Sequence, residues 1–185
     1  MKSLTLQKPC NLLRWLALYR LYMAAFPRAE RKPFFIMRKK FKEGIMDMWC
    51  LEEAGRFLGL VITINSPTLV LIDYLAIHEK HRGKGVGSAA LSAIKAHYTG
   101  RNVFLEIESI YENADNQPER LRRKAFYLRN GLVPMKVMVW LFGVKMELLG
   151  FDGCKIDYPT YYAFYRDNLG QWAANHISSD IHPEA

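Results

Sequence analysis

The sequence predicts an α+β fold, with a mixed, mostly antiparallel sheet of about seven strands between helices on both faces. Short apolar runs rich in β-branched residues come in neighbouring pairs separated by turn residues, which is typical of antiparallel strands. Amphipathic segments interrupt these runs and give the order β-α-α-β-β-β-α-β-α-β-β. The 185 residues are 50% hydrophobic and 24% charged, which suits one domain with a sizeable core.

The N-terminal part of the chain predicts a short strand and two helices. Residues 3–7 alternate polar and apolar side chains, as a strand does. Asn11 can cap a helix that runs to about residue 25, where Pro27 stops it. The apolar stripe of this helix, typical of packing on a core, consists of Leu12, Leu16, Tyr19, Met23 and Phe26. A second helix is expected at residues 34–41.

The remaining elements follow from apolar runs and the turn residues between them. Strands are expected at residues 47–51, 56–64, 69–77, 102–107, 133–142 and 144–149. Helices are expected after the glycines of residues 83–87, up to Tyr98, and at residues 119–130 and 158–168. We expect a single domain over residues 1–170 and a C-terminal tail over residues 171–185.

The net charge of +8 suits a polyanion, such as nucleic acid, a membrane surface or a phosphorylated cofactor. The basic residues are scattered except at residues 38–40 and 120–124, which are typical of solvated faces, so we expect no nucleic-acid partner. No apolar run reaches the roughly 18–20 residues of a membrane span, and we expect no membrane partner. Cys10, Cys50 and Cys154 form neither a metal set nor a disulfide framework, which favours a cytoplasmic protein without a metal.

The most informative stretch is the glycine-rich loop between the strand at residues 69–77 and the helix that follows. This loop consists of Arg82, Gly83, Lys84, Gly85, Val86, Gly87 and Ser88. Its three glycines permit φ > 0 and leave the backbone N–H groups open, and a helix N-terminus follows them. Arg82 and Lys84 add positive charge, so the loop predicts a site for phosphate oxygens.

Two known phosphate-binding motifs are alternatives for this loop. The Walker A pattern does not fit. Residues 85–90 do read G-x-G-x-x-A, and Glu106 lies about 20 residues further on, as in a dinucleotide-binding fold. However, the charged residues 78–84 separate the motif from its strand, and the chain after Glu108 lacks repeated βαβ units. An NAD(P)-dependent oxidoreductase therefore stays an alternative.

The loop resembles more closely the [QR]-x-x-G-x-[GA] pyrophosphate loop of the GNAT superfamily of acyl-CoA-dependent N-acetyltransferases. This motif reads RGKGVG at residues 82–87, and residues 73–77 are similar to the family's fourth strand. Residues 126–132, FYLRNGL, resemble the family's FY-x-x-x-G-[FL] segment. Together the motifs extend the resemblance over most of the chain. It implies a GNAT-like α/β/α fold whose fourth and fifth strands run parallel and splay apart.

The resemblance also implies acetyl-CoA as the acyl donor and assigns roles to residues. The backbone of Leu75, Ala76 and Ile77 would bind the pantetheine arm and polarise the thioester carbonyl. The pyrophosphate would lie on residues 82–88. Tyr127 would protonate the departing CoA thiolate as a general acid.

The sequence departs from the family at one position. Many relatives carry an asparagine about seven residues before the FY tyrosine, where it contacts the cofactor. This chain has Arg120 there, and Asn113 and Asn116 lie further back. Either a longer loop lets an asparagine reach the cofactor, or Arg120 contacts a phosphate instead.

The catalytic base is expected to be a carboxylate, because an amine with a pKa near 10.4 is protonated at neutral pH. Glu106 and Glu108 stand at i and i+2 of one apolar strand, hence on one face. Glu108 is nearer the end of the strand where the cleft should open, and Asp73 on the neighbouring strand is its rival. Either could act through a water, or these acids could simply pair with nearby basic residues.

The sequence thus predicts transfer of an acetyl group from acetyl-CoA to a primary amine of a small molecule or a peptide. A non-catalytic acyl-CoA-binding protein of the same fold is the main alternative. The acceptor site is expected at residues 26–34, where Glu30 could hold a cationic amine. The sequence does not identify the amine, and it is compatible with a homodimer.

Overall fold

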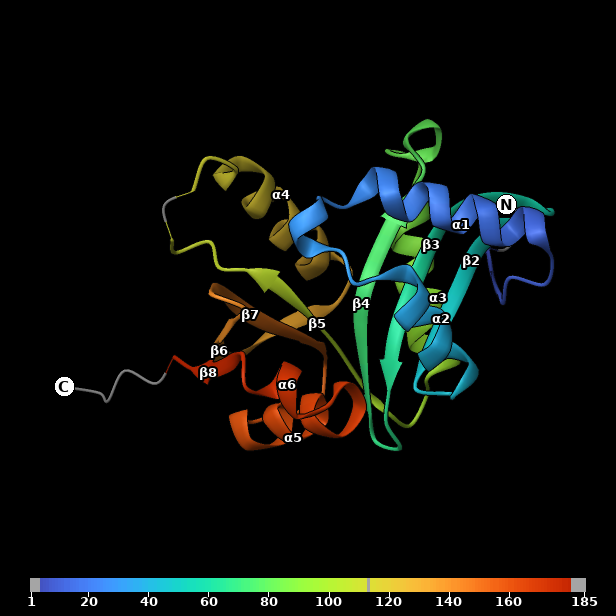
Figure 1. The fold of residues 1–185 in the computed structure, drawn as a ribbon. Helices are drawn as coiled ribbons and strands as arrows, with labels where there is room; N and C mark the ends of the chain where they lie inside the picture. The colour runs from blue at the N-terminus through green and yellow to red at the C-terminus, as the bar shows by residue number, and fades with distance from the viewer. Residues whose placement is uncertain (1–3, 113, 181–185) are drawn as a thin grey trace. The chain divides into compact units, whose positions relative to one another are not determined.

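The computed structural model describes residues 4–112 and 114–180, which form two compact units (Figure 1). Of the described residues, the first unit contains residues 4–65 together with Ile72–Thr99. The second contains Ser66–Leu71 and residues 100–112 and 114–180. The strands form a mixed sheet in the order β1-β2-β3-β4-β5-β7-β6-β8, which confirms the predicted α+β class with eight strands instead of about seven. No helix in the described ranges combines the length and the apolar character needed to span a bilayer.

The first unit contains four strands and three α-helices. Its elements are β1 (Thr5–Gln7), α1 (Leu12–Ala25), the 3-10 helix η1 (Arg28–Glu30), α2 (Phe34–Lys42), β2 (Met46–Glu53), β3 (Arg56–Asn65), the second part of β4 (Leu69–Ile77), the 3-10 helix η2 (Glu79–His81) and α3 (Val86–His97). Strand β3 is buried continuously from Leu58 to Ile64. Such a run indicates a strand covered on both faces, and Figure 1 shows α1 and α2 on one face and α3 on the other.

Helix α1 begins and ends where the sequence predicts. The Asn11 side chain accepts a hydrogen bond from the Arg14 backbone N–H at 2.9 Å, and Pro27 follows the last turn. The predicted core stripe is wrong, however, because the buried side chains of α1 are Leu18, Leu21 and Tyr22. The stripe residues exposed to solvent are Leu12, Leu16, Tyr19 and Met23.

The β2–β3 hairpin turns at Ala54 and Gly55, whose φ angles are 51° and 75°. Both central residues thus have positive φ, as a tight turn between twisted strands requires. Gly59 marks the contact of β3 with β4, because a Cβ there would lie 2.5 Å from the Ala76 carbonyl oxygen. The strand that carries the predicted cofactor-binding backbone is therefore packed closely against β3.

The second unit contains five strands and three α-helices. Its elements are the first part of β4, β5 (Asn102–Glu108), α4 (Gln117–Arg129), β6 (Leu132–Leu141), β7 (Val144–Phe151), α5 (Tyr158–Leu169), α6 (Gln171–Ala174) and β8 (Ile177–Ser179). Strands β4 and β5 pair in parallel through Leu69–Leu71, as the family resemblance implies. The other pairings of this unit are antiparallel.

Part of the expected C-terminal tail is ordered structure. Residues 171–179 contain α6 and β8, and β8 pairs with β6, for example Val139 with Ser179. Ile177 and Ala174 are buried in the second unit. A strand of three residues is too short to give a periodic signal in the sequence, which is why it was not expected.

Candidate active site

The glycine-rich loop presents a run of open backbone N–H groups. Gly83 and Gly85 have φ angles of 71° and 78°, in the left-handed region that glycine favours, and Gly85 is the N-cap of α3. Among the described residues, no acceptor takes a hydrogen bond from the backbone N–H groups of residues 83–88. The space where a Cβ of either glycine would project is open to 4 Å.

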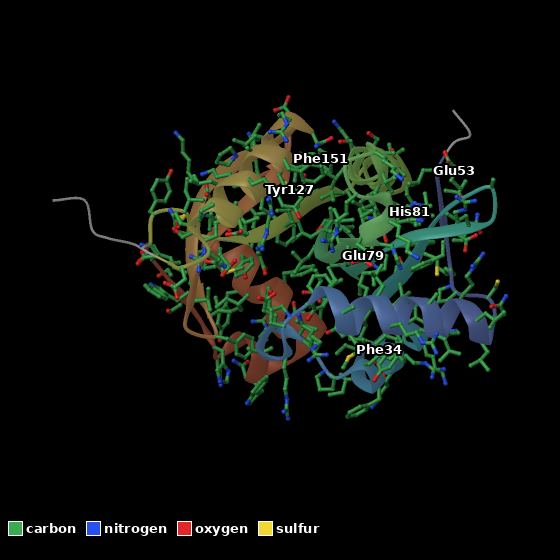
Figure 2. All side chains as sticks on the ribbon, turned by 90° about the horizontal axis from the view of Figure 1, so that it is seen from above. Phe34, Glu53, Glu79, His81, Tyr127 and Phe151 are labelled. Atoms are coloured by element: carbon green, nitrogen blue, oxygen red, sulfur yellow. The ribbon has the colours of Figure 1, made fainter. Side chains whose placement is uncertain are left out.

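The charges around this loop favour an anion. The N-terminus of α3 adds its partial positive charge to the open N–H groups. Arg82 and Lys84 are exposed, and their side chains donate to the carbonyls of Ile77 and Lys80 at 3.1 and 2.9 Å. In Figure 2, Glu79 and His81 mark the η2 turn that leads into the loop. The loop is therefore suited to bind phosphate oxygens through its main chain.

Asp73 lies on the same strand as the predicted cofactor-binding backbone of Leu75, Ala76 and Ile77. Its carboxylate is paired with Lys32, whose Nζ lies 2.7 and 2.9 Å from the two oxygens. The Asp73 side chain is only 6% exposed. Both carboxylate oxygens of Asp73 are therefore held by one cation of the same unit.

Tyr74 fixes the loop in which the acceptor site is expected. Its hydroxyl donates to the Glu30 carbonyl at 2.7 Å and accepts from the Lys32 backbone N–H at 3.2 Å. The Tyr22 hydroxyl donates to the Lys32 carbonyl at 3.0 Å. Burial raises the pKa of both tyrosines well above the usual value, so both stay neutral donors. Sequence reasoning missed these anchors, since a buried tyrosine looks like any other core aromatic.

In the second unit, Tyr127 lies on α4 and is half-buried (Figure 2). Burial raises the pKa of its phenol, and the nearby Arg123 guanidinium offsets this only in part. Among the described residues, the Tyr127 hydroxyl has no hydrogen-bond partner, while its ring packs 5.3 Å from that of Phe126. The phenol is thus held in its protonated form, which is the form a general acid needs.

Glu108, the first candidate base, is paired with two arginines of α4. Arg120 and Arg123 reach its carboxylate oxygens at 2.9 and 3.1 Å. Arg120 also donates to the Ser109 carbonyl and to the Asn116 side chain, at 2.9 and 2.8 Å. Arg120 and Asn116 are therefore bound to each other and to β5, and Asn113 lies outside the described residues.

Glu106 and Glu108 contact different helices, although their spacing predicts one face. Glu106 accepts hydrogen bonds from Tyr161 and Tyr165 of α5, each at 2.8 Å, whereas Glu108 pairs with α4. Glu108 is the last residue of β5, and its side chain reaches the arginines of α4. The i, i+4 spacing of the two tyrosines was the one sequence signal for this partner.

A surface hollow in the second unit contains none of the predicted site residues. Its lining includes Trp140, Phe142, His176 and Asn175, at the tip of the β6–β7 hairpin and beside β8. The predicted site residues are instead divided into two groups, one in each unit. Asp73, residues 75–77 and residues 82–88 belong to the first, and Glu108 and Tyr127 belong to the second.

Comparison with known proteins defines the class as acetyltransferases. The sequence profile of the acetyltransferase (GNAT) family matches residues 15–132, which is more than half of the chain. The chain belongs to the GNAT family. No curated protein sequence matches it significantly.

Solved structures of very different sequence share its fold. A GNAT-family protein from Bacteroides thetaiotaomicron has a TM-score of 0.72 at 17% identity, over 90% of this chain and 95% of that one. An acetyltransferase from Bacillus subtilis in complex with CoA has a TM-score of 0.56 at 17% identity, over 81% and 97%. An aminoglycoside 6'-N-acetyltransferase complexed with coenzyme A has a TM-score of 0.63 at 10% identity, over 80% and 94%.

Proposed function

We propose that this protein transfers an acetyl group from acetyl-CoA to a primary amine of a small molecule or a peptide. The observation that carries the proposal is the run of open N–H groups at residues 83–88, at the start of α3. Family membership supports it, since the matched family is one of acetyltransferases. GNAT-fold proteins have been solved with CoA or acetyl-CoA bound, which supports acetyl-CoA as the donor substrate here.

The residues present fit the chemistry of CoA. A diphosphate needs several convergent donors, and residues 83–88 offer main-chain N–H groups next to the cations Arg82 and Lys84. The pantetheine arm needs an extended backbone, and β4 offers one at residues 75–77. The N–H groups of that backbone would also polarise the thioester carbonyl.

The transfer requires two proton movements. The amine nitrogen attacks the thioester carbonyl, the C–N bond forms, and the C–S bond breaks to release the CoA thiolate. A carboxylate takes the proton of the amine through a water, and Tyr127 gives its phenolic proton to the thiolate. Burial raises the pKa of the Tyr127 phenol, so the group carries the proton that this step needs.

Glu108 is a better base than Asp73 on grounds of access. The Glu108 side chain is 20% exposed, whereas the Asp73 side chain is 6% exposed. A water that carries the amine proton can therefore reach Glu108 more readily. Both acids are ion-paired, so either would have to act as the carboxylate of an ion pair.

The same pairing favours one competing function, a non-catalytic acyl-CoA-binding protein. If neither carboxylate accepts the amine proton, the fold binds CoA without turnover. Thermal-shift measurements with acetyl-CoA, CoA, NAD and NADP test the binding, and we expect a shift with acetyl-CoA and CoA. Release of free CoA thiol with a panel of amines tests the transfer. A thermal shift with acetyl-CoA or CoA but no thiol release would favour the non-catalytic binding protein. A thermal shift only with NAD or NADP would contradict both acetyl transfer and acyl-CoA binding.

A further inference from the structure

The positive charge of the chain is concentrated in its N-terminal part. Residues 8–42 contain ten lysines and arginines and one acid, Glu30, which gives this stretch a formal charge of +9. The whole chain carries +8, so the rest of the protein is close to neutral. Helices α1 and α2 both lie in this stretch and contain no acidic residue.

The same two helices expose large apolar side chains. Leu12, Leu13 and Phe35 have 71%, 75% and 75% of their surface exposed. The other exposed apolar residues of α1 and α2 are Leu16, Tyr19, Met23 and Ile36. An exposed apolar stripe of three helical turns is unusual for a helix that packs on a sheet, because such a stripe normally faces the core.

The exposed residues of the two helices belong to one continuous surface. Trp15 of α1 packs edge-on against Phe34 and Phe41 of α2, at 6.3 and 5.5 Å between ring centroids. Tyr19 lies 5.0 Å from Phe34, and the Arg38 guanidinium lies 4.7 Å over the Trp15 ring. Figure 2 shows Phe34 next to α1. We call the exposed side chains of α1 and α2 the α1–α2 face.

The cations of this stretch fall into two groups. Lys8, Arg14 and Lys32 pair with Asp47, Glu52 and Asp73, at 3.0, 2.6 and 2.7 Å, and so serve the fold. Arg20, Arg38, Lys39 and Lys42 are exposed on the helices beside the apolar side chains. The only carboxylate that pairs with them in the described residues is Glu43, at 3.9 Å from Lys39. Apolar and basic side chains thus share the α1–α2 face.

We propose that the α1–α2 face binds an anionic lipid surface. Lipid headgroups would meet the exposed cations, and the acyl region would take up the leucines and Phe35. A second copy of the chain is a poor occupant, because pairing the face with itself would bring two strongly basic surfaces together. Nucleic acid is also poor, because it would leave the exposed leucines in water. The proposal departs from the sequence expectation of no membrane partner.

Co-sedimentation with lipid vesicles tests this proposal. We expect the full chain to bind vesicles of phosphatidylcholine that contain about one third phosphatidylserine. It should bind vesicles of phosphatidylcholine alone only weakly, and its binding to the anionic vesicles should fall as the salt concentration rises. The double variant Leu12→Ser/Phe35→Ser should lower the partition coefficient at least about tenfold. Arg20→Gln/Lys42→Gln should lower it by roughly tenfold to thirtyfold.

Matched variants of the second unit are the controls. Tyr111→Ser/Trp172→Ser removes two aromatic residues of similar exposure, 72% and 70%, and Arg129→Gln/Lys155→Gln removes the same charge. Both should bind vesicles as the unchanged protein does. Equal loss in the control variants, or equal binding to neutral vesicles, would overturn the proposal. A third result would also overturn it. If neither the parent nor any variant binds vesicles, and sedimentation velocity shows a dimer that Leu12→Ser/Phe35→Ser abolishes, the α1–α2 face binds a second copy of the chain.

Discussion

The two units differ in how they supply groups to the proposed chemistry. The first unit offers main-chain N–H groups at residues 83–88 that have no acceptor among the described residues. The second offers side chains, and two of its carboxylates are already occupied: Glu108 by Arg120 and Arg123, and Glu147 by Lys124 at 2.7 Å. Open donors therefore mark the binding part, whereas a paired acid is not evidence of a catalytic one.

Tyr127→Phe should have the largest effect, because it removes the proposed general acid, whose hydroxyl has no hydrogen-bond partner among the described residues. We expect kcat to fall by about 10²–10³ and the Kd for acetyl-CoA to change less than twofold. Calorimetry and thiol release measure the two quantities, with the exposed Tyr111→Phe as the control. Unchanged turnover would remove Tyr127 from the mechanism.

The pH profile sharpens the same test. A raised pKa keeps the phenol protonated to higher pH, so the alkaline limb of kcat should lie above pH 10. Tyr127→Phe should abolish this limb in whatever turnover is left. A limb below pH 10 that persists in the variant would assign the titration to another group.

Glu108→Gln asks whether a paired carboxylate can still be a base. We expect kcat/KM to fall by about thirtyfold to a hundredfold at neutral pH, because the amine then loses its proton only to solvent. The deficit should shrink as pH rises toward the amine's own pKa, near 10.4. Turnover measured over this pH range checks both statements.

Glu147→Gln is the matched control for that variant. Its carboxylate is also ion-paired in the second unit and is 6% exposed, but it has no proposed catalytic role. It should lower the melting temperature without a deficit that depends on pH. If both variants behave alike, the role of Glu108 is structural. The first unit would then bind acetyl-CoA, and the ion-paired carboxylates of the second unit would only stabilise the fold.

Gly87→Ala tests the first unit in the opposite sense. Gly87 is the second residue of α3, so alanine, a better helix former, should stabilise the helix by at most about 0.5–1 kcal/mol. The added methyl group would stand among the N–H groups of residues 83–88, and we expect the Kd for acetyl-CoA to rise by roughly ten- to thirtyfold. Melting and calorimetry separate the effects, and Ser92→Ala, also on α3 and exposed, is the control. Tighter or equal binding would contradict the phosphate site.

The contrast also explains what the sequence could predict. Glycine requirements are local, since φ angles of 71° and 78° at Gly83 and Gly85 exclude most other residues, so the loop could be found from the residues alone. Pairing is not local: Arg120 and Arg123 lie 12 and 15 residues beyond Glu108. No spacing rule for one strand shows which helix will bind its last side chain.

The error on α1 has a similar cause. The helix is apolar almost all round, with Arg14 and Arg20 as its charged residues, so its periodicity could not choose between two stripes. Leu18, Leu21 and Tyr22 took the core, and which stripe does so depends on how the helix lies on the sheet. The stripe left over is the one assigned to the α1–α2 face.

The smallest effect concerns tyrosines that resemble Tyr127 only in the direction of their pKa shift. Tyr98 of the first unit is buried, and its hydroxyl donates to Asp47 at 2.9 Å and accepts from Trp49 at 3.0 Å. Burial raises its pKa, so the folded state holds the phenolic proton above pH 10, where the unfolded state has lost it. The stability from Tyr98 is therefore present below pH 10 and is lost as pH rises.

The variant Tyr98→Phe tests this argument. We expect its free energy of unfolding to fall between pH 9 and pH 10.5 by about 1 kcal/mol less than that of the parent, although the variant is the less stable protein at both pH values. Urea unfolding at the two pH values measures this difference, with the exposed Tyr19→Phe as control. An equal loss in the parent and in Tyr98→Phe would mean that burial does not hold this proton, and the same argument for Tyr127 would weaken with it.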